Sequence, residues 1–599
     1  MVFPASEPSL GLSSGSPEFD DLDDLGEQVQ RFARRYRGQV AQLSPPELAA
    51  ALQELARLTQ RMQESLPEAK TTAGPAEAAW QRLEQAISFQ SQLLFFPLEL
   101  QSLPAVPATG PAEGAPHDQE GQRPVEPELQ PFRQFLCRLR HQQGHQQPEP
   151  LERLLHQQYL TGRLAWRQLW QVTLNSPAAL PDHTLVRLQS LETHTSAELR
   201  WDAYQRLSQH LEAHAELGGF ILSTLIRDHL WEAQWRGYDC VAELYLARHG
   251  LTQTFLENLL EGIRDRFDLF QRYYRLKSRT MGRSIRICDL HAPWEDPVPL
   301  LTAAEATSLV WAALQDFCPE CAAQAKPWLL EVGSEADQPE SSPRPGEAGF
   351  LLQALAAISR RLRPEDPQVW LDLEEMQGGG YAPSAQMWGV QVHTALLQQI
   401  FLDHLVASAM GSPRVGGPAL YNPEGQRSSS LKLAQAVLIG HLEAQLQAVF
   451  YQSLIARLEL LLYRSGIPEN NATFPLWVSE EWLKLCQELC GDAVELLPEH
   501  QFRWVGMPEL FLRPFSAYQA SLASLVAMAC HRRYRSSPRN FLPHYLHWLA
   551  SPPGSLTLEE TTQRLQADLS DPEGVLQALE ELEHWIETLE KLLEEDPDH

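Results

Sequence analysis

Two histidines in the segment HLEAH have a spacing that zinc chemistry uses. In a helix, histidines four residues apart lie on one face, and a glutamate directly after the first can activate a metal-bound water. His210 and His214 have this spacing, but Glu212 follows the first histidine by two residues instead of one. It therefore points about 100° further round the helix. We expect His210 and His214 to be surface histidines and not metal ligands.

A second candidate segment is GVQVHTALLQ, residues 389–398, which holds one histidine, His393. His404 follows eleven residues later, close to three helical turns, so both histidines could share one face. At a rise of about 1.5 Å per residue they stand about 16 Å apart, too far for one zinc with bonds of about 2 Å. The complete H-E-x-x-H motif does not occur in the chain.

The cysteines offer two further patterns. Cys318 and Cys321 have the C-x-x-C spacing of a redox pair or half a zinc site, and Cys486 and Cys490 are one helical turn apart. A four-thiolate zinc site would require the two pairs to meet in space. Eight cysteines spread over 599 residues suit a reducing compartment. We therefore expect free thiols with independent structural roles and no disulfide.

Composition limits the classes of partner. The chain has 48 basic and 77 acidic residues and a formal charge of -29, which argues against nucleic acid or an anionic membrane as the main partner. No apolar run approaches the roughly 20 residues that a bilayer span needs, and the N-terminus lacks a basic region followed by an apolar one. These features predict a cytoplasmic protein.

Apolar residues recur at helical spacing along most of the chain, so the sequence predicts an all-α fold. The expected order is a disordered N-terminus at 1–17, an N-terminal helical region at 18–103, a Pro/Gly-rich flexible insertion at 104–127 and a large helical body at 128–599. Within that body, MQGGGYAPSAQ is the strongest backbone break. It opens the region 376–430, which contains His393, and residues 450–599 form a C-terminal block.

Several long segments resemble oligoendopeptidase F and its thimet-oligopeptidase relatives, which are zinc metallopeptidases. The matching segments are WEAQWRGYDCVAELYLARHGLTQTFLENLLEGIRDRFDLFQRYYRLKSRTMG, YQSLIARLELLLYRSG and CGDAVELLPEHQFRWVGMPELFLRPFSAYQASLASLVAMA. The family's D-L-x-A-P, W-x-x-x-P and P-F-x-x-Y-Q elements appear at Asp289, Leu290, Ala292 and Pro293, at Trp504 and Pro508, and at Pro514, Phe515, Tyr518 and Gln519. The resemblance implies a multi-helical shell around an internal channel, starting near residue 18.

The same resemblance implies where a zinc site would lie. In the preferred register His393 matches the first zinc histidine, so Thr394 occupies the general-base position and Leu397 the second-ligand position. The downstream ligand would be sought near Glu424, in a Pro/Gly-rich loop. In the other register His404 matches the second histidine, and Ile400 and Phe401 replace the first histidine and the glutamate. Both registers lack essential groups.

The C-terminal block departs from the family as well. Glu509 stands where the family has a histidine, and Phe511, Leu512, Ser516 and Ala520 occupy places where tyrosines are common. An acidic group would repel the negative charge that develops on the substrate. Tyr518 remains, and Tyr381 lies only about a dozen residues before His393, closer than the family spacing implies. Tyr381 and Tyr518 are the peptide-binding candidates.

Three hypotheses remain open. The first is a non-catalytic oligoendopeptidase F-like protein that binds peptides or a protein partner and needs no cofactor. The second is an active zinc peptidase with a rebuilt site, using His393 or His404 with Glu424 or Asp403. The third is a purely structural helical scaffold. Metal content, peptide cleavage and peptide binding separate them.

Overall fold

A computed structural model provides the fold of most of the chain. It describes residues 19–64, 76–103, 126–175, 185–294, 303–335, 348–362, 388–410, 427–467, 473–551, 556 and 558–595. These residues form helices, and the one β-type pairing among them is an isolated parallel bridge between Arg286 and Glu495. The predicted all-α fold class is confirmed. No helix in these ranges has both the length and the apolar character needed to cross a membrane.

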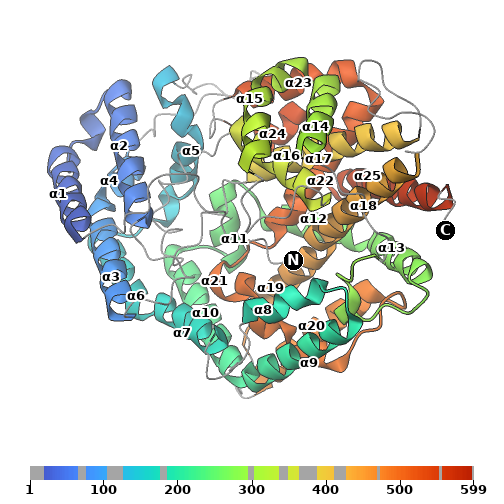
Figure 1. The fold of residues 1–599 in the computed structure, drawn as a ribbon. Coiled ribbons are helices and arrows are strands. Elements are labelled where there is room, and N and C mark those ends of the chain that lie inside the picture. The colour runs from blue at the N-terminus through green and yellow to red at the C-terminus, as the bar shows by residue number, and fades with distance from the viewer. Residues whose placement is uncertain are drawn as a thin grey trace.

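Five helices near the N-terminus form a layer on one side of the molecule (Figure 1). They are α1 (Phe19–Tyr36), α2 (Pro45–Glu64), α3 (Ala76–Leu93), α4 (Phe95–Gln101) and α5 (Arg133–His141). Along α1, Leu25, Val29, Phe32 and Tyr36 recur at helical spacing and are all buried. They belong to a hydrophobic core that this layer builds for itself.

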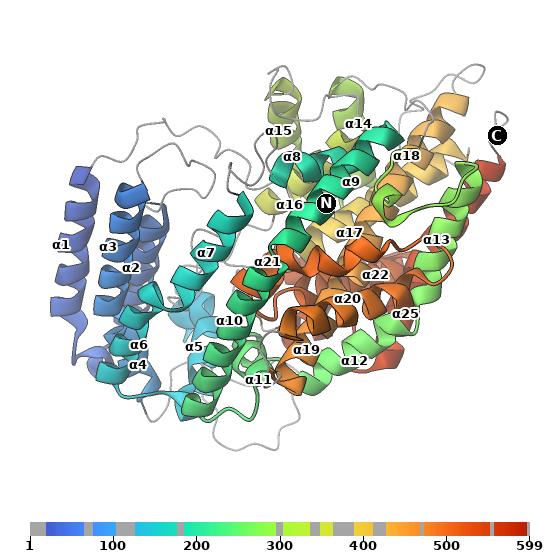
Figure 2. The same cartoon turned by 90° about the horizontal axis from the view of Figure 1, so that it is seen from below.

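The next helices lead from that layer into the body of the molecule, as the view from below shows (Figure 2). They are α6 (Glu149–Thr161), α7 (Arg163–Asn175), α8 (Leu185–Ser190), α9 (Ala197–Ala213), α10 (Ala215–Arg236), α11 (Val241–Leu246), α12 (Gln253–Arg264) and α13 (Phe267–Thr280). Helix α10 ends at Gly237, whose φ of 72° is left-handed. A residue with a side chain would be strained there, so glycine suits this helix end.

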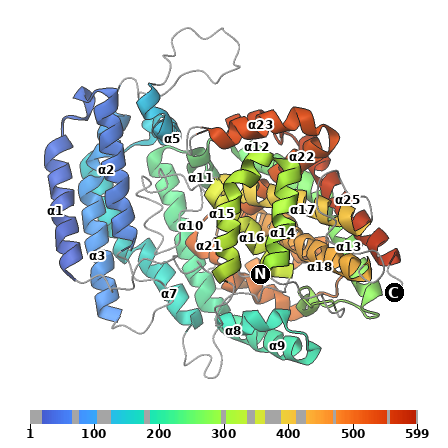
Figure 3. The same ribbon diagram turned by 45° about the horizontal axis from the view of Figure 1, so that its top comes forward.

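The remaining helices make up the large body (Figure 3). They are α14 (Ala303–Phe317), α15 (Pro319–Glu335), α16 (Ala348–Leu362), α17 (Trp388–Ala409), α18 (Arg427–Leu446), α19 (Gln452–Ser465), α20 (Phe474–Cys490), α21 (Pro508–Leu512), α22 (Tyr518–Ser536), α23 (Pro538–Ala550), α24 (Leu558–Leu565) and α25 (Pro572–Glu594). A π-helical turn, Gln447–Tyr451, joins α18 to α19. Helix α17 packs against α14, α16, α18 and α22.

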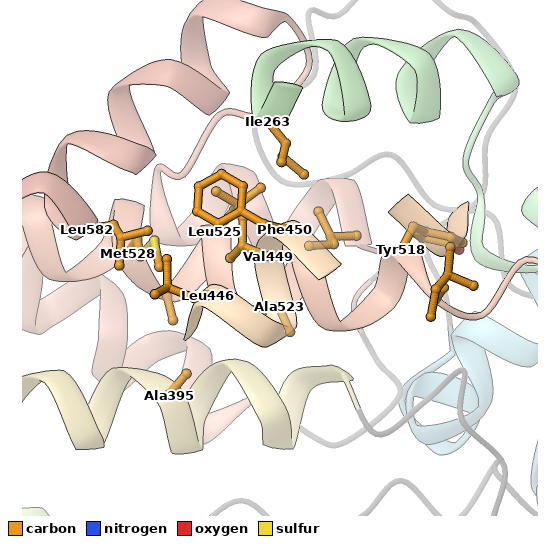
Figure 4. Close-up of a cluster of buried hydrophobic side chains, with 14 of the residues drawn as sticks. Ile263, Ala395, Leu446, Val449, Phe450, Tyr518, Ala523, Leu525, Met528 and Leu582 are labelled. Atoms are coloured by element: carbon orange, nitrogen blue, oxygen red, sulfur yellow. The ribbon is translucent and has the colours of Figure 1, made fainter. Parts of the chain in front are cut away.

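The body's core gathers around α17 and α22 (Figure 4). Ala395 of α17 points toward apolar side chains of α18, the π-helical turn, α22 and α25, among them Leu446, Val449, Met528 and Leu582. Apolar side chains are buried all round α17, as expected of a helix with neighbours on several sides. His393 therefore lies on a core helix.

Some expectations fall on parts of the chain that the structure does not describe. These are the N-terminus at 1–17, nearly all of the insertion at 104–127 and, within 376–430, residues 376–387 and 411–426. Tyr381, Glu424 and the glycine break lie in these parts.

Candidate functional site

His393 lies in the second turn of α17 and is fully buried. Its Nδ1 is 3.0 Å from the Ser359 hydroxyl and 3.3 Å from the Ser359 carbonyl oxygen on α16. Its Nε2 is 2.7 Å from the Tyr545 hydroxyl on α23. The rings of Tyr545 and Trp548 pack beside the imidazole. Both ring nitrogens thus have protein hydrogen-bond partners, which stabilises a histidine in a core.

In the preferred register, Thr394 stands at the general-base position and Leu397 at the second-ligand position. Neither residue has a carboxylate or an imidazole. Thr394 is partly buried beside His393, and its hydroxyl is a far weaker base than a carboxylate. Leu397 is 1% exposed and belongs to the hydrophobic core. The second-ligand position is therefore filled by an apolar side chain that helps pack the body.

His404 occupies a different part of α17. Its Nδ1 lies 2.9 Å from Asp316 Oδ2 on α14, and both side chains are mostly shielded from solvent. Within the described ranges, no group of three or more His, Cys, Asp or Glu side chains is placed to hold a metal ion. The residues that the structure describes therefore do not fit the zinc site that the family resemblance implies.

The HLEAH segment forms the end of α9, and the surface placement expected there is wrong for one of its histidines. His210 is buried, with its Nε2 3.0 Å from the Leu174 carbonyl oxygen. His214 Nδ1 lies 2.7 Å from the His210 carbonyl oxygen. The contact with Leu174 of α7 lies outside α9, so the local sequence does not reveal it.

The C-terminal block is largely core. Trp504, Phe515 and Tyr518 are each at most 2% exposed, as the preference of large aromatic side chains for core packing predicts. Tyr518 therefore presents little surface to a peptide in this structure. Glu509, where the resemblance implies a histidine, lies 3.4 Å from the Gln452 side-chain amide.

The same block contains a buried carboxyl, Glu459, that no sequence motif indicates. Glu459 of α19 is 1% exposed and accepts a 2.8 Å hydrogen bond from the Phe515 amide. Burial raises the pKa of Glu459 well above its usual value in spite of that bond. Phe515 has a left-handed φ of 54°, so this contact holds an unusual backbone turn in place.

A second buried cluster joins α17, α22 and α25. His531 Nε2 lies 3.1 Å from Asp403 Oδ2, and its Nδ1 lies 2.9 Å from Glu581 Oε1. Burial opposes the charge on His531, but the hydrogen bonds and attraction of the two carboxylates outweigh it and raise the pKa of His531. No spacing rule could find this cluster, because its members come from helices far apart in sequence.

The D-L-x-A-P element has a structural role that its geometry explains. Asp289 is fully buried and accepts hydrogen bonds of 2.7 and 3.0 Å from Arg200 of α9, and one of 2.8 Å from Arg283. Burial opposes ionisation, but the hydrogen bonds from Arg283 and Arg200 hold the pKa of Asp289 below its usual value. The element thus ties α9 to the turn after α13.

Comparison of the whole structure with solved structures gives near-complete matches. Oligoendopeptidase F from Enterococcus faecium superposes with a TM-score of 0.68 at 16% identity, over 96% of this chain and 98% of that one. The chain has the oligoendopeptidase F fold. PZ peptidase A, solved with an inhibitor, matches with a TM-score of 0.62 at 12% identity, over 96% and 98% of the two chains.

The oligoendopeptidase F fold predicted from the signature segments is therefore confirmed. No protein-family model and no curated protein sequence matches this chain. At such low identity the fold does not carry the activity with it, and function has to be argued from the site.

Proposed function

We propose that this chain is a non-catalytic protein of the oligoendopeptidase F fold that binds peptides or a protein partner without hydrolysing them. The observation that carries the proposal is the environment of His393. This histidine is enclosed in the core, with Ser359 at one ring nitrogen and Tyr545 at the other.

The chemistry of the neighbouring positions supports the same conclusion. Zinc-dependent peptide hydrolysis needs about three protein ligands for the metal, an open coordination position for water and a general base. Thr394 and Leu397 supply neither the base nor the second ligand, and His404 is engaged by Asp316. Glu509 adds a carboxylate where a hydrogen-bond donor would be needed to stabilise an oxyanion. Two separate parts of the peptidase machinery are missing together.

Peptide binding without cleavage is the expected behaviour. A mixed library of fluorescently labelled peptides should bind the full chain by anisotropy, while quenched versions of the same peptides stay intact over hours. Cleavage that a chelator abolishes would contradict the proposal and favour the rebuilt zinc site. Absence of binding, with intact peptides, would favour the purely structural scaffold.

A further inference from the structure

Two cysteines next to the His393 environment form a close pair at the start of α15. Cys318 Sγ lies 2.7 Å from Cys321 Sγ, and the Cys321 amide donates a 3.2 Å hydrogen bond to Cys318 Sγ. Both thiols are free. Both are almost fully buried, but Pro319 and Glu320, which form the turn between them, are exposed. A small solute can therefore approach this turn from outside.

The two thiols are chemically unequal. Cys318 precedes the first turn of a 17-residue helix, where amide N–H groups and the helix dipole favour a thiolate. The hydrogen bond from Cys321 lowers the pKa of Cys318, whereas the same contact and burial raise the pKa of Cys321. Cys318 is therefore the thiol of the pair that ionises more readily.

A chain of side chains connects the pair to α17. The Tyr545 hydroxyl lies 2.7 Å from His393 Nε2, and a hydrogen bond from the same hydroxyl lowers the pKa of Cys321 against the larger effects that raise it. Tyr545 has one hydroxyl proton, so it can donate to only one of these partners. If it donates to Cys321, His393 must carry its proton on Nε2 and accept from the Ser359 hydroxyl at Nδ1. One set of proton positions thus satisfies the whole chain from Ser359 to Cys321.

We propose that Cys318 and Cys321 form a peroxide-sensitive dithiol whose oxidation changes the hydrogen bonds of His393. The Cys318 thiolate attacks one oxygen of hydrogen peroxide and breaks the O–O bond, giving a sulfenic acid and hydroxide, which becomes water by taking up the proton that Cys318 lost on ionising. The Cys321 thiol then attacks the sulfenic sulfur and displaces a second water. Two thiols and one peroxide thus give one disulfide and two waters. The inference does not depend on peptide binding.

Oxidation reaches α17 through Tyr545. A disulfide sulfur is a weaker acceptor than a thiol or thiolate, so the Tyr545 hydroxyl turns its proton to His393 Nε2. His393 then carries its proton on Nδ1 and donates it to the Ser359 carbonyl oxygen, which already lies 3.3 Å away. The redox state of the pair therefore selects the tautomer of His393.

The first test uses the unmodified chain, which contains its own control pair. Cys486 and Cys490 are also buried and one turn apart, but they lie at the C-terminal end of α20, where the dipole disfavours a thiolate. After treatment with hydrogen peroxide, remaining thiols are trapped with N-ethylmaleimide and mapped by mass spectrometry. We expect a Cys318–Cys321 disulfide, reversed by dithiothreitol, to form at least tenfold faster than any loss at Cys486 or Cys490. Equal rates at both pairs, or thiols at Cys318 and Cys321 that remain free, would overturn the proposal.

The second test reads the coupling to α17. Protein labelled with ¹⁵N only in histidine side chains reports each tautomer by NMR, and the signal missing in His393→Gln assigns His393. Stoichiometric disulfide formation should move the proton of His393 from Nε2 to Nδ1, and Tyr545→Phe should abolish this response without preventing the disulfide. An unchanged His393 spectrum in the fully oxidised wild type would refute the coupling.

Discussion

His393 is enclosed by α16, α17 and α23, and removing its ring would take one hydrogen-bond partner from the hydroxyls of Ser359 and Tyr545. We predict that His393→Ala lowers the free energy of unfolding by about 2–4 kcal/mol, through the cavity and the lost hydrogen bonds of Ser359 and Tyr545. Urea denaturation measures this loss. Thr394→Ala, at the partly buried neighbouring position, is the control and should change stability by less than about 1 kcal/mol. Equal effects of the two substitutions would contradict a core role for His393.

The buried His531 gives stability a pH dependence. The groups that face it are Asp403 of α17, His441 of α18, Arg535 of its own helix, and Glu581, His584 and Trp585 of α25. The folded pKa of His531 lies above its ordinary 6.5. Its contribution to the free energy of unfolding is therefore complete below about pH 6.5 and is lost as pH rises through the folded pKa.

Glu581 gives the free energy of unfolding the opposite pH dependence. Burial raises the pKa of Glu581, but the hydrogen bonds and positive charges of His531 and Arg535 outweigh burial. The folded pKa therefore lies below the ordinary 4.5. Its contribution is present above about pH 4.5 and is lost as pH falls through the folded pKa. We expect the free energy of unfolding to decline above about pH 6.5. His531→Gln should flatten that decline, and an unchanged pH profile in this variant would argue against the cluster.

At the scale of helices, the buried ion pair between α9 and the turn after α13 offers a direct test of the D-L-x-A-P element. Asp289→Asn should cost about 3–5 kcal/mol, because it leaves the Arg200 guanidinium buried without its counter-charge. Asp202→Asn removes the partner of Arg206 in an exposed pair on the same helix α9 and should cost at most about 1 kcal/mol. Chemical denaturation of both variants measures the contrast. Similar losses would mean that the buried pair does not hold α9 in place.

Helix positions could be predicted from sequence where one face is apolar. Leu25, Val29 and Phe32 of α1 repeat at helical spacing and are buried, as that pattern indicates. The same pattern could not show that His210 is buried, because its ring contacts the Leu174 carbonyl oxygen of a different helix, α7. Nor could it bring Asp403, His531 and Glu581 together, since pairing between distant helices leaves no local spacing.

At the scale of the whole molecule, the signature segments indicated the oligoendopeptidase F fold because they supply its packing contacts. Asp289 and Trp504 are both buried, and Trp504 donates a hydrogen bond to Ser479. The sequence could therefore indicate the architecture and the missing zinc motif, but the packing that surrounds His393 required the structure.

The most direct test of a non-catalytic site is the metal content of the protein purified without added metal or chelator, measured by elemental mass spectrometry. Because both ring nitrogens of His393 are engaged and no other described group completes a zinc site, we predict far less than one zinc per chain. His393→Ala should leave that content unchanged. One zinc per chain that is lost in His393→Ala would contradict the account and make His393 a metal ligand.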